Sequence, residues 1–333
     1  VQSNWRIVQR DWTILQFDWT PPDGPVACRT FLLEVRYAMP ELGNLVTAMV
    51  TPFDDSLQVD YNRLAELSVR LADAGSDLLV SGTTGESPTT SVEEKLEMFR
   101  VVREAVGDDV SIVAGTGSND TARSIALTGQ ATELGVLDAI LLVGPYYNKP
   151  SQEGFYQHFR AVAQSTDLPV VLYNVPGRTG KNIECSTVVR LAEDVENIVG
   201  MKEASGDLDQ ISEMCRDVPE GFRVWSGDDA MTLPILAVGG VGVISVASHI
   251  APEEIGEMID CYHNGDVVRA AQIHGRLLPL YHACFLASGN PPCVKRALEV
   301  CGFPVGGTRL PVVPASDKDT ATIREVCEKL GYA

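Results

Sequence analysis

The chain has few of the residues on which several common types of site depend. It contains five histidines in 333 residues, and no two of them form a ligand-spaced pair with each other, with a carboxylate or with a cysteine. No metal is therefore expected. None of the eight cysteines forms a C-x-x-C pair. In a chain of this length we interpret them as reduced thiols.

Long hydrophobic runs and an excess of basic residues are also absent. No stretch is long and apolar enough to span a membrane, so no membrane association is expected and a cytoplasmic protein is predicted. The net charge of −19 disfavours a nucleic-acid partner. Gly115-Thr116-Gly117 is too short for a nucleotide fingerprint, and nothing requires a nicotinamide or flavin. We therefore expect no cofactor.

Residues 1–38 differ from the rest of the chain. They contain three of the four tryptophans, and their acidic and basic residues balance, so the negative charge belongs to the remainder. We interpret them as an N-terminal extension upstream of Met39, disordered or not native. The alternative is an arm that packs on a partner subunit.

From residue 43 onward, short apolar runs rich in β-branched residues alternate with helical patterns. Continuous apolar runs of this kind are typical of strands buried on both faces. The predicted strands begin near Leu45, Asp77, Val110, Asp138, Leu168, Asn197, Phe222 and Val241.

Several of the intervening helices have recognisable starts. Ser91 and Glu94 have the spacing of a capping box. Ser151, Ser186 and Asp207 stand at positions where N-terminal caps are expected.

Eight strand-helix units imply parallel strands that close on themselves. We therefore predict a (β/α)8 TIM barrel over residues 39–265. Three more helical segments predict a C-terminal helical domain over residues 266–333.

In such a barrel the active site lies at the carboxyl ends of the strands. Lys202 ends the sixth predicted strand, where burial would favour a neutral amine that can form a Schiff base with a ketone. Tyr173 ends the fifth and can pass protons. Thr83 and Thr84 follow the second, and Arg178 offers a fork for a carboxylate. The set suits a keto acid held as a Schiff base beside a second anionic reactant.

Each of these residues also has a purely structural interpretation. A lone lysine is usually a surface residue, Tyr173 could be a core aromatic, and Arg178 could form a surface ion pair. At least one of Tyr146 and Tyr147 is expected to be structural. We interpret Glu86, Asp228 and Asp229 as loop and helix-cap residues.

Six ordered segments resemble the dihydrodipicolinate synthase family, which belongs to the class I pyruvate-dependent aldolases. The resemblance runs from about Leu42 to the C-terminus. The segments are GTTGES (82–87), AGTGSN (114–119), PYYNKPSQEG (145–154), YNVPGRTG (173–180), GMKEASG (200–206) and SGDDA (226–230).

The resemblance implies condensation of pyruvate with L-aspartate 4-semialdehyde, without a cofactor, on the lysine branch from aspartate. It implies that Lys202 carries the Schiff base and that Tyr173 relays protons with Thr84 and Tyr147. In the family this second tyrosine reaches into the neighbouring subunit's site, which implies a homo-oligomer. Most members are tetramers built as dimers of dimers.

The resemblance also implies substrate-binding residues. Thr83, Thr84, Gly227 and Ile244 match pyruvate-pocket positions, and Arg178 matches the arginine that holds the semialdehyde's carboxylate. N-acetylneuraminate lyase-like enzymes and 2-keto-3-deoxy sugar acid aldolases, which usually lack this arginine, are the alternatives. An alternative of another class is a barrel that binds a keto acid without turnover.

One departure from the family concerns regulation. Asn119 and Tyr146 match a possible effector site for lysine. Lysine-inhibited members tend to carry histidine and glutamate at positions that correspond to Val92, Lys95 and Arg123. The two basic residues place positive charge where a cationic effector would sit, so we predict weak or absent lysine feedback.

Overall fold

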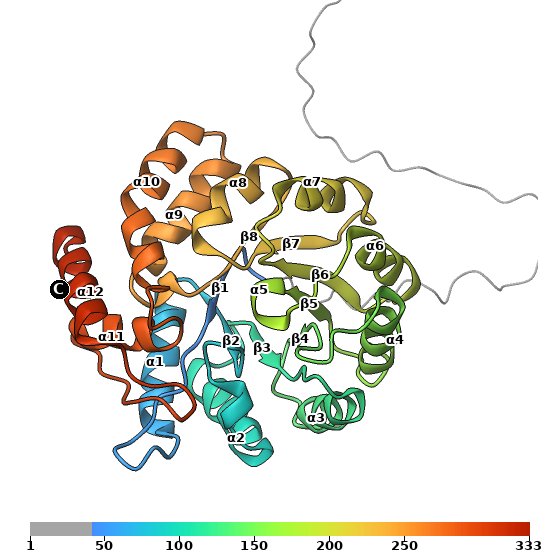
Figure 1. Cartoon of the computed structure of the whole chain (residues 1–333), viewed down its shortest axis with the longest axis horizontal. Coiled ribbons are helices and arrows are strands. Elements are labelled where there is room, and N and C mark those ends of the chain that lie inside the picture. The colour runs from blue at the N-terminus through green and yellow to red at the C-terminus, as the bar shows by residue number, and fades with distance from the viewer. Residues whose placement is uncertain (1–41) are drawn as a thin grey trace, which may run out of the picture. The chain divides into compact units, whose positions relative to one another are not determined.

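The computed structural model describes residues 42–333, and the predicted N-terminal extension, residues 1–38, lies outside them. Within the described residues, parallel strands pair in chain order and close into a barrel, because β1 pairs with β8 as well as with β2 (Figure 1). This confirms the predicted (β/α)8 class. The strands are β1 (Leu45–Ala48), β2 (Asp77–Val80), β3 (Ile112–Gly115), β4 (Ala139–Val143), β5 (Val170–Asn174), β6 (Ile198–Glu203), β7 (Arg223–Ser226) and β8 (Gly242–Ser245).

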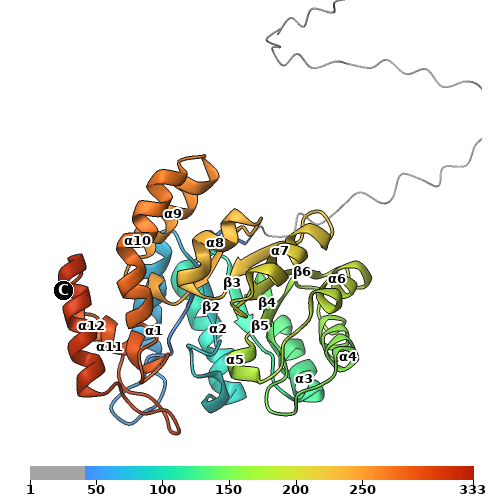
Figure 2. The same ribbon diagram turned by 45° about the horizontal axis from the view of Figure 1, so that its top comes forward.

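Helices surround the barrel, and a C-terminal group extends it on the side of α1 and α9 (Figures 1 and 2). None of the helices in residues 42–333 is both long and apolar enough to cross a bilayer. The barrel helices are α1 (Tyr61–Asp73), α2 (Val92–Val106), α3 (Thr121–Glu133), α4 (Gln152–Ala163), α5 (Pro176–Thr179), α6 (Cys185–Asp194), α7 (Leu208–Asp217), α8 (Thr232–Ala237) and α9 (Pro252–His263). The C-terminal group is α10 (Val267–Ala283), α11 (Pro292–Val300) and α12 (Asp317–Leu330), and 3-10 turns occur at η1 (Ser87–Thr89), η2 (Asp229–Met231) and η3 (Ala247–His249).

The predicted helix caps are confirmed with one exception. Ser91 Oγ accepts from the Glu94 amide and the Glu94 carboxylate accepts from the Ser91 amide, so both halves of the capping box form. Ser151 and Asp207 cap α4 and α7 through their side chains. The prediction for Ser186 was wrong, because α6 already begins at Cys185 and residue 186 lies in its first turn.

Two hydrophobic layers form the core, one inside the barrel and one between the strands and the helices. On β1, Val46 and Ala48 belong to the inner layer and Leu45 to the outer one, as the two-residue period of a strand requires. Trp225 on β7 fills the inner layer, and its indole Nε1 donates to Gly43 O at 3.0 Å. The barrel is therefore a packed core, with room for chemistry only at its ends.

Candidate active site

A β-bulge in β6 sets which way Lys202 points. Val170 pairs with Ile198, but Val171 pairs with Gly200, so Val199 is an extra residue in β6. As a result Tyr173 stands opposite Lys202, and residues opposite each other in a sheet share a face. Because Tyr173 belongs to the inner layer, the bulge brings the lysine to the barrel interior beside it.

Lys202 is buried, and burial makes its amine more reactive. The residue is only 4% exposed, and its Nζ lies 4.6 Å from the centroid of the Tyr173 ring. The pKa of Lys202 falls from 10.5 to about 7, chiefly because of burial; the Asp229 charge acts to raise it and the Arg178 charge to lower it. Near neutral pH a large share of the amine is therefore unprotonated and nucleophilic.

The neighbouring carboxylates hold the ends of the strands. Asp229 accepts from the Val246 and Ala247 amides, each at 3.1 Å, and from the Ser245 hydroxyl, so it ties the end of β7 to the end of β8. Asp228 caps η2 by accepting from the Ala230 amide. Both carboxylates have the structural roles that the sequence predicted for them.

Tyr173 remains protonated over the whole neutral range. Burial raises its pKa to about 12, while the Arg178 charge and the nearby Thr83 side chain act in the opposite direction. The Oγ1 of Thr84, the partner that the resemblance implies, accepts from Asn290 Nδ2 at 2.9 Å. Thr83 and Tyr173 line the same cavity, so Thr83 is a second candidate partner of the tyrosine.

Gly227 directly follows β7 and lies against the lysine, and Ile244 stands on the neighbouring strand β8. A Cβ at position 227 would lie 2.8 Å from the Ala204 Cβ and 3.1 Å from the Lys202 Cγ, so only glycine leaves the lysine its space. The Gly227 amide donates to Glu203 O at 2.7 Å. Ile244 is buried in the inner layer. These positions shape the site by steric fit.

Arg178 stands on the short helix α5 that follows β5. It is exposed at the surface, and its Nη2 donates to Asn290 O at 3.3 Å. Asn290 thus contacts both Arg178 and Thr84 from the C-terminal region, and sequence reasoning did not predict it. An asparagine before a proline is a turn signal that carries no information on a contact with residues more than a hundred positions away.

A cavity of about 630 Å³ leads into this mouth. Thr83, Tyr173 and Arg178 line it at the barrel, and Lys95 and Arg123 line it further out. None of the residues in 42–333 that line the cavity carries a carboxylate, although the protein is strongly acidic. A locally positive approach suits anionic substrates.

The predicted effector residues and Tyr147 lie on this outer side. Tyr146 lines the cavity together with Val92, whereas Asn119 is not among the lining residues. Asn119 O accepts from Asn148 Nδ2 at 2.7 Å. Tyr147 is 89% exposed and has a φ of 73°, so it projects outward from a strained loop.

No group of three or more His, Cys, Asp or Glu side chains in residues 42–333 is placed to hold a metal ion. Of the histidines, His249 has a structural role. Its Nε2 accepts from the Val50 amide at 3.1 Å, its Nδ1 pairs with Val246 O at 2.8 Å, and burial lowers its pKa to about 4.

A closed (β/α)8 barrel with a buried lysine of lowered pKa at its mouth defines a class of protein, the class I aldolases. The family model described as the Dihydrodipicolinate synthetase family matches residues 41–330. The chain belongs to this family.

Known relatives agree with this assignment over most of the chain. A protein of Heliobacterium modesticaldum named 4-hydroxy-tetrahydrodipicolinate synthase is 55% identical over 292 residues, which are 87% of this chain and 96% of the relative. A Bacillus anthracis dihydrodipicolinate synthase structure superposes with a TM-score of 0.84 at 47% identity, covering 86% of this chain and 98% of that one. A Cyanidioschyzon merolae homologue solved with lysine bound gives 0.86 at 44% identity, covering 88% and 99%.

Proposed function

We propose that the chain condenses pyruvate with L-aspartate 4-semialdehyde to give 4-hydroxy-tetrahydrodipicolinate, through a Schiff base on Lys202. The observation that carries the proposal is the buried amine with a pKa of about 7 next to Tyr173. An amine of this kind attacks a ketone at neutral pH without a cofactor. The product enters the lysine and diaminopimelate branch.

The reaction begins when the neutral Lys202 amine attacks the pyruvate ketone and water leaves. The resulting iminium is an electron sink, so the methyl group loses a proton and an enamine forms. The enamine carbon attacks the aldehyde, and the substrate amine then closes the ring and expels the lysine. Tyr173, protonated and beside Thr83 in the cavity wall, is the group that moves protons in these steps.

Charge selects the substrates. Thr83 and Thr84 belong to a glycine-flanked turn that can hold the pyruvate carboxylate, with Gly227 and Ile244 completing the pocket. Arg178 holds the carboxylate of the semialdehyde through its guanidinium fork. A sugar acid aldolase would need hydroxyl-binding groups at that position instead of a cation.

Tyr147 completes the site of a neighbouring subunit. Its exposure of 89% and its outward loop support this role, because a large aromatic side chain gains most from burial at an interface. The working unit is then at least a homodimer, and a tetramer is a dimer of such dimers. The reaction takes place in the cytoplasm.

The experiment that tests the proposed function is an assay coupled to a dihydrodipicolinate reductase, run with pyruvate and L-aspartate 4-semialdehyde. Turnover supports the proposal. Cleavage of sialic or 2-keto-3-deoxy sugar acids without condensation would favour the aldolase alternative. A trapped pyruvate imine with no turnover of either substrate type would identify a keto-acid-binding barrel.

A further inference from the structure

A buried ion pair joins the C-terminal helical region to the turn that carries Thr83. Glu86 Oε1 lies 2.7 Å from Lys295 Nζ, and the two side chains are only 2% and 3% exposed. Lys295, on α11, also donates to Gly307 O at 2.6 Å and lies 4.2 Å from the centroid of the Phe53 ring. More than two hundred residues separate the partners in the chain, so this is a contact between the appendage and the barrel mouth.

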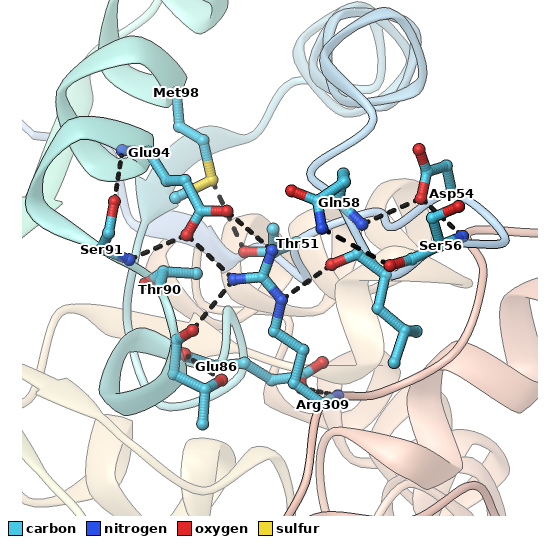
Figure 3. Close-up of polar contacts among 12 residues, drawn as sticks. Thr51, Asp54, Ser56, Gln58, Glu86, Thr90, Ser91, Glu94, Met98 and Arg309 are labelled. Carbon is cyan, nitrogen blue, oxygen red and sulfur yellow. Dashed lines mark hydrogen bonds and ion pairs between the residues drawn. The ribbon is translucent and has the colours of Figure 1, made fainter.

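Arg309 adds a second set of contacts at the same place. Its amide donates to Glu86 Oε2 at 2.9 Å, so both carboxylate oxygens are held by the C-terminal segment. Its guanidinium donates to the Glu94 carboxylate at 2.9 and 2.6 Å, as Figure 3 shows. It also donates to Thr89 O at 2.9 Å. A third donor, Nε, reaches Leu57 O. The arginine therefore connects the loops after β1 and β2.

The turn held in this way controls where Thr83 stands. Glu86 has a φ of 55°, an unusual value for a residue with a side chain, and its amide donates back to Thr83 O at 3.1 Å. The Gly85 carbonyl accepts from Thr51 Oγ1 at 2.6 Å. A turn with this backbone persists only where its surroundings hold it, and the Glu86 carboxylate is the charged contact through which the C-terminal segment does so.

Stability alone is a poor explanation for such a pair. The cost of removing two charges from water offsets much of the free energy gained from their attraction. An apolar pair of the same shape therefore often stabilises a protein as much as the ion pair does. What the charged pair adds is geometry, because Glu86 Oε2 accepts a hydrogen bond from the Arg309 amide while Oε1 is paired with the Lys295 charge. Thr83, three residues earlier, is the residue that benefits, because it lines the cavity beside Tyr173.

We propose that Glu86 and Lys295 are positioning residues, through which the C-terminal helical segment holds the β2 turn so that the Thr83 side chain stays beside Tyr173 in the wall of the cavity. The inference rests on the proposed function, because it assigns the pair to the proton-transfer steps. It gives the C-terminal region a role in catalysis through the position of Thr83.

The test compares two measurements in Glu86→Gln, Lys295→Met and the double variant. The first measurement is the amount of pyruvate imine on Lys202 that borohydride traps at equilibrium with saturating pyruvate. The second is the exchange of pyruvate methyl protons for deuterium in heavy water, followed by NMR. Arg103→Met is the matched control, because it removes the ion pair with Asp138 near the amino end of β4, away from the mouth.

We expect all three variants to trap imine within about twofold of the wild type, while methyl exchange slows about 10- to 100-fold, since positioned proton transfer contributes on that order. The control should leave both measurements unchanged. Methyl exchange at the wild-type rate, or imine and exchange falling in parallel, would overturn the proposal. A wild-type protein that forms no imine would instead refute the proposed function.

Arg309→Lys provides a second route if the Glu86 and Lys295 variants do not fold. It keeps the positive charge and the amide donor to Glu86 but loses the guanidinium contacts to Thr89, Leu57 and Glu94. A smaller loss of exchange, by about threefold to tenfold with imine formation retained, is expected from a partial release of the turn. Unchanged exchange in this variant overturns the proposal equally.

Discussion

Lys202 and Lys295 are two buried lysines with opposite surroundings. Each is 4% exposed, and burial lowers the pKa of both. Lys295 has a carboxylate at 2.7 Å and a carbonyl at 2.6 Å. Lys202 lies over the Tyr173 ring and has no ion pair with a carboxylate of residues 42–333.

The comparison separates two uses of the same side chain. A buried ammonium with a carboxylate beside it stays charged and ties two segments together. A buried amine without one gives up its proton and becomes a nucleophile. The surroundings, and not the residue type, decide between a structural and a chemical lysine, and the following predictions test that difference from the largest expected effect to the smallest.

The largest effect is expected from Lys202→Ala. Turnover should fall by on the order of 10⁴-fold or more, because no other group supplies the imine. In the wild type, borohydride reduction with pyruvate should add mass to the peptide that contains Lys202 and not to that of Lys295. Peptide mapping by mass spectrometry reads both results. A label on Lys295 would reverse the roles assigned to the two lysines.

The stability effects of removing the two charges should have opposite signs. Lys202 has a folded pKa of about 7 against 10.5 in the unfolded chain, so the unfolded state binds more protons between these values and stability rises with pH across that window. Lys202→Met removes the penalty and should stabilise the fold at neutral pH by up to roughly 5 kcal/mol. Lys295→Met leaves Glu86 buried without its partner and should destabilise by about 3–5 kcal/mol.

Thermal midpoints at one protein concentration, measured near neutral pH and near pH 10, check both signs. The advantage of Lys202→Met should shrink at the higher pH, because the wild-type protein gains stability as the pH rises from the folded pKa of Lys202 toward its unfolded pKa of 10.5. A Lys202→Met protein that melts below the wild type at neutral pH would contradict the prediction.

Arg178→Ala should separate the two substrates. We expect kcat/KM for the semialdehyde to fall by about 10- to 100-fold, the usual effect of losing a charge-assisted contact. The amount of pyruvate imine trapped at saturating pyruvate should stay near the wild-type value. Steady-state kinetics give kcat/KM, and borohydride trapping gives the amount of imine. If imine formation falls while kcat/KM for the semialdehyde does not, the arginine binds pyruvate and the assignment is wrong.

The pH dependence of imine formation should report the amine of Lys202. The rate should rise about tenfold per pH unit below about pH 7 and level off above it. Because the Arg178 charge lowers this pKa, Arg178→Ala should move the break to higher pH. Stopped-flow measurements across the range provide the profile, and a flat profile through neutrality would argue against a titrating amine.

The smallest effect that we expect is on inhibition by lysine, and it concerns Lys95. Burial lowers the pKa of this lysine, and the Glu94 charge only partly offsets the shift. It lines the cavity with Arg123, so a cationic effector meets positive charge there. We expect L-lysine to inhibit weakly or not at all. Tight inhibition of the purified enzyme by sub-millimolar lysine in the coupled assay would show this prediction to be wrong.

Much of this architecture could be predicted because it depends on local pattern. Every strand begins at its predicted start or one to two residues after it, since continuous β-branched runs mark strands buried on both faces. The closed barrel follows from their number, and it places the residues at strand ends together. That is why Lys202, Tyr173, Thr83 and Arg178 could be grouped in advance.

Contacts over long separations could not be predicted. Asn290, Lys295 and Arg309 reach the β2 and β5 loops from the C-terminal segment, and no periodicity links them. The choice between adjacent Thr83 and Thr84 depends on the direction of two hydroxyls, which the turn backbone sets. Neighbouring threonines have the same local signals, so only the fold distinguishes them.

The amino-acid sequence by itself determined the alternation of strand and helix, and with it the barrel and the end of each strand where chemistry can occur. The tertiary structure alone decided that the β6 bulge turns Lys202 inward and that its pKa falls while Lys295 is paired. The physical reason is that desolvation and pairing depend on atoms brought from elsewhere in the chain. A lysine carries no local signal of which partners folding will bring to it.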